Sequence, residues 1–147
     1  RIIMKLDEFI SPQERTLLVN AIKEAEKMTS GEIRVHIEPN CGKNVIARAI
    51  KVFKKLKMNK TALRNGVLIY VAYESKQFSI IGDKGINEVV PEDFWNSISE
   101  KIHHSFSSGN IVEGFEVAIK EAGKKLSEFF PYSEDDINEQ SDEISIG

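Results

Sequence analysis

The sequence has a single cysteine and no long apolar run, and each of these two absences excludes a class of protein. The single cysteine, Cys41, excludes an internal disulfide framework and a metal site built from several cysteines. No apolar run approaches the roughly 18–20 residues of a membrane-spanning helix, and the N-terminal residues lack the apolar core of a signal peptide. Gly and Pro number 9 and 4 in 147 residues, an ordinary globular composition. We therefore expect a cytoplasmic domain with no transmembrane segment that buries a core of its own.

Charge is distributed unevenly along the chain. The 20 Lys and Arg residues stand against 23 Asp and Glu residues, a formal net charge of −3. Residues 131–147 carry acidic side chains but no Lys or Arg, few aromatics and no hydrophobic periodicity. This composition is typical of disorder. We expect one domain over residues 1–130 and an acidic, disordered tail over 131–147, which either only solubilises the protein or folds back onto a basic helix.

Hydrophobic periodicity predicts a helix-strand-helix-strand-strand-helix-helix order. The helices are expected at 12–28, 45–56, 91–106 and 111–129, and the strands at 33–37, 67–73 and 78–81, with a loop over 82–90. The first two strands form a right-handed parallel crossover, and the third returns antiparallel as a hairpin. The expected fold class is α/β, with a small mixed sheet flanked by helices on both faces.

This topology gathers polar residues at one edge of the predicted sheet. Glu32 begins the first strand, Asn65 precedes the second and Asp83 follows the third, while Glu88 and Asp93 come soon after. Carboxylate and amide oxygens suit a hard cation such as Ca²⁺ or Mg²⁺, although the loop does not match the EF-hand pattern. The alternative is structural: such acids also shape turns and complement a helix dipole.

Several stretches of the chain resemble the TPM domain family. They are SGEIRVHI at 30–37, RNGVLIYVA at 64–72, FSIIGDKGINEVV at 78–90, FW at 94–95 and SSGNIVEGFEVAI at 107–119. The resemblance implies an α/β sandwich with a small central sheet. It also implies divalent-cation binding, notably of Ca²⁺, near the acidic strand edge, and a phosphatase activity that has been claimed for some members. The matching positions would be Glu32, Asp83 and the acids after Gly85, with Glu92 and Asp93 as candidates for one of them.

The residue patterns of common phosphatases are missing from the chain. It has no P-loop, no Cys followed five residues later by Arg, and no aspartyl-nucleophile motif. Phosphatase chemistry would therefore have to be metal-assisted at the acidic cluster. His36 and Cys41 are separated across a strand end, and the adjacent His103 and His104 lack the spacing of a metal-binding pair.

The helix expected at 45–56 is basic, with Arg48, Lys51 and Lys55 on one stripe. Such a stripe is either the solvated face of an amphipathic helix or a docking surface for an acidic protein partner. The pI near 5.7 and the lack of interleaved aromatics argue against nucleic acid as that partner.

These observations lead to one favoured function and two alternatives. We expect a monomeric domain that binds a divalent cation, Ca²⁺ before Mg²⁺, and has a regulatory or interaction role. The ligands in order of preference are Asp83, Glu32, Asp93, Glu88 and Asn65. The alternatives are a metal-assisted phosphatase acting on phosphate esters and a protein-interaction module that uses the basic helix.

Overall fold

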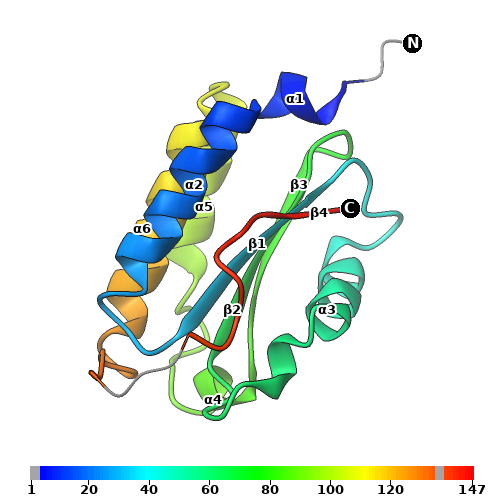
Figure 1. Cartoon of the computed structure of the whole chain (residues 1–147). Helices are drawn as coiled ribbons and strands as arrows, with labels where there is room; N and C mark the ends of the chain where they lie inside the picture. Colours follow the sequence, from blue (N-terminus) through cyan, green and yellow to red (C-terminus); the bar gives the residue numbers. More distant parts are fainter. Residues whose placement is uncertain (1–3, 135–137) are drawn as a thin grey trace.

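The central strand, β2 (Gly66–Ala72), is apolar on both faces, and all of its residues are buried. A strand of this kind needs a covering layer on each side of its sheet. The computed structural model, which describes residues 4–134 and 138–147, has that arrangement, with helices on both faces of the sheet (Figure 1). The α/β class and the mixed sheet predicted from the sequence are confirmed.

The sheet of the described residues has four strands in the order β3-β2-β1-β4. The partners of β2 are β1 (Glu32–Glu38), β3 (Gln77–Gly82) and β4 (Ser145–Ile146). β1 runs parallel to β2, with Glu32 opposite Gly66, and β3 runs antiparallel to β2, with Val67 opposite Gly82. The predicted crossover and hairpin therefore both form. The first residues of β2 and the last residues of β3 lie at the same end of the sheet.

One face of the sheet is covered by α2 (Pro12–Ala25), α5 (Asn96–Ser107) and α6 (Ile111–Leu126). A capping box starts α2: the Ser11 hydroxyl accepts the Glu14 N–H, and the Glu14 carboxylate accepts the Ser11 N–H. The helices α2 and α6 pack closely, because a Cβ added at Gly123 would lie 2.8 Å from the Cβ of Ala25. This layer and the sheet enclose the larger apolar core, which includes Ile10, Leu18, Ile22, Ile33, Val35, Ile37, Phe115 and Ile119.

The opposite face is covered by α3 (Val45–Lys55) and the short 3₁₀ helix η1 (Met58–Lys60). Asn44 caps α3, since its side chain accepts the Ala47 N–H at 3.0 Å. This smaller core consists of Cys41, Ala49, Val52, Phe53, Met58, Leu68, Tyr70 and Ala72. The even-numbered residues of β2 thus face α3, and the odd-numbered ones face the larger core, as the period of two requires.

Several predicted boundaries differ from the structure. The expected loop over 82–90 contains α4 (Lys84–Asn87), and a further short helix, α1 (Leu6–Phe9), precedes α2. α4 forms because the Asp83 side chain accepts the Lys84 N–H and caps the turn. The last long helices are shorter than predicted, because 92–95 and 127–129 are turns.

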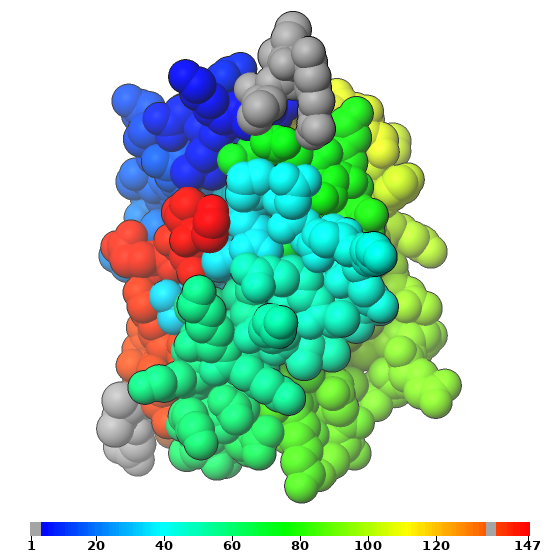
Figure 2. All heavy atoms as spheres, turned by 90° about the vertical axis from the view of Figure 1, so that its right-hand side faces the viewer, coloured from blue at the N-terminus to red at the C-terminus, as the bar shows by residue number. Residues whose placement is uncertain are grey.

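The C-terminal segment, for which the sequence predicts disorder, is instead ordered along β1 over residues 138–147. β4 pairs in parallel with His36 and Ile37 of β1, and the Gly147 N–H donates to the Ile37 carbonyl at 2.9 Å. The segment gains order because β1 offers it an open row of backbone groups. Figure 2 shows it, in red, beside α3 rather than across the helix. Residues 135–137 of the predicted tail lie outside the described residues.

No helix within residues 4–134 and 138–147 is both long enough and apolar enough to span a membrane.

Candidate functional site

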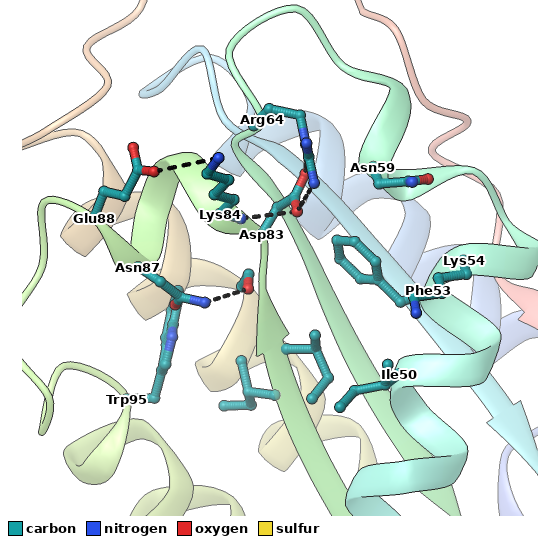
Figure 3. Close-up of a pocket in the computed structure, with 13 residues that line it drawn as sticks. Ile50, Phe53, Lys54, Asn59, Arg64, Asp83, Lys84, Asn87, Glu88 and Trp95 are labelled. Atoms are coloured by element: carbon teal, nitrogen blue, oxygen red, sulfur yellow. Dashed lines mark hydrogen bonds and ion pairs between the residues drawn. The ribbon is translucent and has the colours of Figure 1, made fainter.

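Asp83, the first-ranked ligand in the sequence prediction, lies where β3 ends and α4 begins. Its carboxylate is only 6% exposed. The Arg64 guanidinium donates two hydrogen bonds to it, from Nε to Oδ2 at 2.7 Å and from Nη2 to Oδ1 at 2.9 Å (Figure 3). The Lys84 N–H donates a third at 2.8 Å. The Asp83 charge is thus balanced by a single guanidinium held in a bidentate geometry.

The local backbone explains why Arg64 meets Asp83. Arg64 has a left-handed φ of 52° in the turn before β2. The Gly85 N–H donates to the Arg64 carbonyl at 2.8 Å, which holds α4 against this turn. A Cβ at Gly85 would clash with the Leu63 carbonyl oxygen and would lie 2.7 Å from that of Arg64. The close contact between α4 and the turn therefore requires glycine at this position.

The ion pair is asymmetric in its exposure to solvent. The Arg64 side chain is 44% exposed, whereas the Asp83 side chain is almost fully buried. The hydrogen bonds to Asp83 raise the pKa of the Arg64 guanidinium, outweighing the opposite effect of its partial desolvation. Because the guanidinium lies on the solvent side, it can move away from the carboxylate without opening the core.

A groove of about 610 Å³ lies beside this ion pair, between α3 on one side and α4 with Trp95 on the other (Figure 3). We call it the β3 groove. Its apolar lining comes from Ile50, Phe53, Ile80, Ile81 and Trp95, and its polar lining comes from Lys54, Asn59, Arg64, Asp83, Lys84, Asn87 and Glu88. The groove therefore combines an apolar floor with charged and amide groups at its rim.

Of the predicted ligands, Asp83 and Glu88 share the β3 groove. Glu88 pairs loosely with Lys84 of the same short helix, at 3.9 Å. Near them, the Asn87 side-chain amide donates to the Gly82 carbonyl at 3.0 Å. The end of β3 thus presents two carboxylates and an amide oxygen in the same groove.

Glu32 and Asn65 lie at the same end of the sheet as Asp83, but their side chains form hydrogen bonds with other parts of the chain. The Glu32 carboxylate accepts the N–H of Glu139, from the C-terminal segment, at 2.8 Å. The Asn65 side chain is buried and donates to the Ser30 carbonyl at 3.3 Å. Both side chains therefore connect the first residues of β1 and β2 to neighbouring segments of the chain.

Asp93 lies apart from the other predicted ligands. It lines a separate surface cavity of about 550 Å³, between the start of α5 and the end of α6, together with Phe94 and Lys125. Over residues 4–134 and 138–147, no group of three or more His, Cys, Asp or Glu side chains is arranged to hold a metal ion. The predicted ligands are thus not brought together as one set.

The structure contains a buried polar network that the sequence prediction did not include. Its centre is Glu38 of β1, which is 4% exposed. Glu38 accepts hydrogen bonds from Arg48 Nε at 2.6 Å, from Arg48 Nη2 at 2.8 Å and from the Tyr70 hydroxyl. The His36 ring lies 3.0 Å from the same carboxylate. Arg48, assigned from the sequence to a surface docking stripe, is therefore part of an internal ion pair, whereas Lys51 and Lys55 are exposed.

The protonation states in this network follow from burial and hydrogen bonding. Burial raises the pKa of Glu38, but the hydrogen bonds from Arg48, Tyr70 and His36 outweigh it and hold the pKa at about 2. Burial lowers the pKa of His36, although its contact with Glu38 opposes this shift. At neutral pH, His36 is thus neutral and donates Nε2–H to Glu38, so its Nδ1 accepts the Ser145 hydroxyl, 2.9 Å away.

A second pair of side chains, at the other end of β1, holds the C-terminal segment. Glu26, just after α2, accepts the Ile33 N–H at 3.2 Å. Burial and a hydrogen bond with Asp142 of the C-terminal segment raise the pKa of Glu26 to about 10, against the opposing effect of the Ile33 N–H. Glu26 is therefore protonated at neutral pH, which allows its close contact with a second carboxyl group.

The sequence profile of the TPM domain matches residues 3–125 of the chain, a range that includes all of α1 and ends in the last turn of α6. The chain belongs to the TPM domain family. This TPM domain is also similar to a solved structure, the NMR structure of the BA42 protein from the psychrophilic bacterium Bizionia argentinensis sp. nov.. The two chains are 49% identical and superpose with a TM-score of 0.91, over 97% of this chain and 99% of that one. A search of curated proteins finds no similar sequence.

The family assignment confirms the resemblance deduced from the sequence. The matched region contains the Arg64–Asp83 pair, the β3 groove and the Glu38 network. The segment that pairs with β1, residues 138–147, lies beyond the part that the family profile covers. The candidate site of this TPM domain is thus part of the matched region, whereas β4 lies outside it.

Proposed function

We propose that this TPM domain binds a divalent cation, Ca²⁺ before Mg²⁺, at the end of β3 and acts as a regulatory or interaction module. The supporting observation is the setting of Asp83: a buried carboxylate in a groove that it shares with Glu88, its charge balanced by a side chain that is 44% exposed. Carboxylate and amide oxygens are the donors that Ca²⁺ takes. Glu32 and Asp93 belong to other parts of the structure and are not included in this set.

Arg64 gives the proposal a specific energetic consequence. The guanidinium and the cation compete for the same carboxylate oxygens, so binding must displace two hydrogen bonds of 2.7 and 2.9 Å. A site with few protein ligands and a resident competitor is weak, with a dissociation constant on the order of 10⁻⁴–10⁻³ M. Removing the competitor should therefore tighten binding.

The test is a thermal-shift titration of metal-free protein with Ca²⁺ and Mg²⁺. A ligand at 100 times its dissociation constant stabilises the native state by about 2.7 kcal/mol. We expect a saturable rise in Tm that Asp83→Asn abolishes and that Arg64→Ala moves to lower Ca²⁺ concentration. Asp93→Asn, a carboxylate in a separate cavity, is the matched control and should leave the titration unchanged. No shift up to about ten times the expected dissociation constant in both the wild type and Arg64→Ala would refute the proposal.

The alternative is a metal-assisted phosphatase that acts on phosphate esters, and a specific observation makes it testable. An ion that takes Asp83 would leave the Arg64 guanidinium beside it, and guanidinium groups stabilise phosphoryl charge. Hydrolysis of p-nitrophenyl phosphate with each metal distinguishes the two functions. A metal-dependent rate that is lost in Asp83→Asn and in Arg64→Ala would favour the enzyme, and binding without turnover would favour the module.

A further inference from the structure

We propose that the β3 groove is also a docking site for an extended acidic peptide of a partner protein, which adds to the sheet as a strand beside β3. The sheet order places β3 at an edge, and no other strand of the described residues pairs with its outer side. The opposite edge, by contrast, is occupied by β4. Open sheet edges bind extended peptides through backbone hydrogen bonds.

The pairing of β2 with β3 fixes which backbone groups face outward. The Asp83 N–H donates to the Gly66 carbonyl at 2.9 Å, so Asp83 faces β2. In an antiparallel ladder, residues facing the partner alternate with residues facing away. Phe78, Ile80 and Gly82 therefore direct their N–H and C=O groups away from β2. The Gly82 carbonyl accepts the Asn87 side chain, which leaves Phe78 and Ile80 as the backbone positions for an incoming strand.

The groove has an apolar wall on each side of this edge. On the α3 side, Ile81 packs against the smaller core, and Ile50 and Phe53 line the groove. On the other side, Ile80 and Trp95 pack against the larger core. Successive side chains of an added strand point to alternate faces of the sheet. Each wall can thus accept alternate residues of the peptide, and Ile50, 40% exposed, has apolar surface left to bury.

Charge determines the kind of partner. The acids of the groove already have partners, since Asp83 pairs with Arg64 and Glu88 with Lys84. Lys54 lines the groove, and no ion pair involving it occurs among the described residues. Exposed lysines of the same helix, Lys51 and Lys55, add to the positive potential. An acidic strand is attracted to this rim, whereas the edge of a second copy would bring the same positive charges together.

The sequence of β3 itself lacks the devices that normally protect an edge strand. Its six residues, QFSIIG, include no Lys, no other charged residue and no proline. Natural edge strands are commonly protected by such residues or by a covering element. β3 therefore remains competent to pair, and the surrounding charge selects what it pairs with.

The experiment follows backbone amide shifts of ¹⁵N-labelled full-length protein, kept in EDTA so that no cation contributes. The probe is an acetylated octapeptide of alternating Glu and Val residues, and its counterpart has Lys in place of Glu. We expect saturable shifts centred on Phe78 and Ile80 with the Glu peptide alone, weakening as salt is added. A Glu peptide with N-methylated backbone should lose the shifts, because strand pairing requires its N–H groups.

Matched variants separate docking from general charge attraction. Lys54→Glu should raise the dissociation constant of the Glu peptide about tenfold, a change of 1.4 kcal/mol. Lys120→Glu makes the same charge change on α6, in the layer on the far side of the sheet, and should leave the constant unchanged. The proposal is overturned if the Lys peptide binds equally well, if the shifts map to β1 or α6, or if both variants weaken binding alike. Because EDTA is present throughout, failure of cation binding would not affect this result.

Discussion

Glu38 of β1 and Arg48 of α3 form a bidentate ion pair, with oxygen–nitrogen distances of 2.6 and 2.8 Å. The carboxylate is almost fully buried, and the guanidinium is 33% exposed. The pair joins the first turn of α3 to the sheet. It therefore fixes the position of the helix that forms one wall of the β3 groove.

Replacing Glu38 by Gln should destabilise the protein by about 3 kcal/mol, because it leaves Arg48 without its counter-charge in a mostly buried site. Urea unfolding of the variant and the wild type would measure the difference. Glu116→Gln, an exposed carboxylate on α6, serves as the control and should change the free energy of unfolding by less than about 0.5 kcal/mol.

The same variant should show a defined pH dependence. The folded pKa of Glu38, about 2, lies below its ordinary value of 4.5. A depressed carboxylate pKa contributes stability that is present above the unfolded pKa and is lost as pH falls through the folded pKa. The stability gap between the wild type and Glu38→Gln should therefore narrow between pH 5 and pH 2. A constant gap across this range would contradict the assignment.

Glu26 should produce the opposite dependence on pH. Its folded pKa, about 10, lies above the ordinary 4.5, so the folded state retains a proton that the unfolded state loses. The free energy of unfolding should therefore fall as pH rises from the unfolded pKa of 4.5 toward the folded pKa of about 10. Glu26→Gln should flatten the profile and be more stable than the wild type at pH 9. Glu24→Gln, at an exposed position of α2, should reproduce the wild-type slope.

Gly85→Ala should cost about 1–3 kcal/mol, the usual penalty for adding a methyl group to a closely packed site. The added Cβ would meet the carbonyl oxygens of Leu63 and Arg64, so α4 would have to move away from the turn. Gly82→Ala is a matched control, since its Cβ would meet its nearest atom at an ordinary 3.4 Å. Equal losses in the two variants, measured by thermal unfolding, would show that the close contact at Gly85 is not the cause.

Deleting residues 138–147 should open the β1 edge. The deletion removes the backbone pairing with His36 and Ile37 and uncovers the His36–Glu38 contact. We expect hydrogen exchange to accelerate in β1, whereas the amides of α6 keep their protection as an internal reference. Unchanged exchange in β1 would mean that β4 contributes no protection.

The elements predicted correctly are those with local signals. The start of α2 follows from Ser11 and Glu14, three residues apart, and β2 follows from a continuous apolar run between turns. The sequence predicts a loop where α4 forms, because Asp83 is interpreted there as a metal ligand or a turn residue and not as the cap of a helix. β4 was missed because an acidic, aperiodic segment gives no sign of a strand when its partner lies 109 residues away.

The candidate site was predicted only in part for a similar reason. The strand topology predicts the position of Asp83 at the end of β3. The pairing of Asp83 with Arg64 depends on a left-handed backbone conformation at Arg64, for which the sequence contains no signal. The burial of Glu38 results from partners 10 and 32 residues away. One signal was present: Tyr70, in an otherwise apolar buried run, carries a hydroxyl that needs a partner on the α3 face.

The two cores differ in the sequence separation of the residues that form them. The α3-side core draws its fully buried members from residues 41–72, whereas the larger core joins residues as distant as Ile10 and Leu126. Closing a longer loop costs more entropy, and distant contacts slow folding. We therefore expect the crossover of β1, α3 and β2 to form early in folding and the α2–α6 layer to close later. On that expectation, the groove wall formed by α3 is in place before the α2–α6 layer is complete.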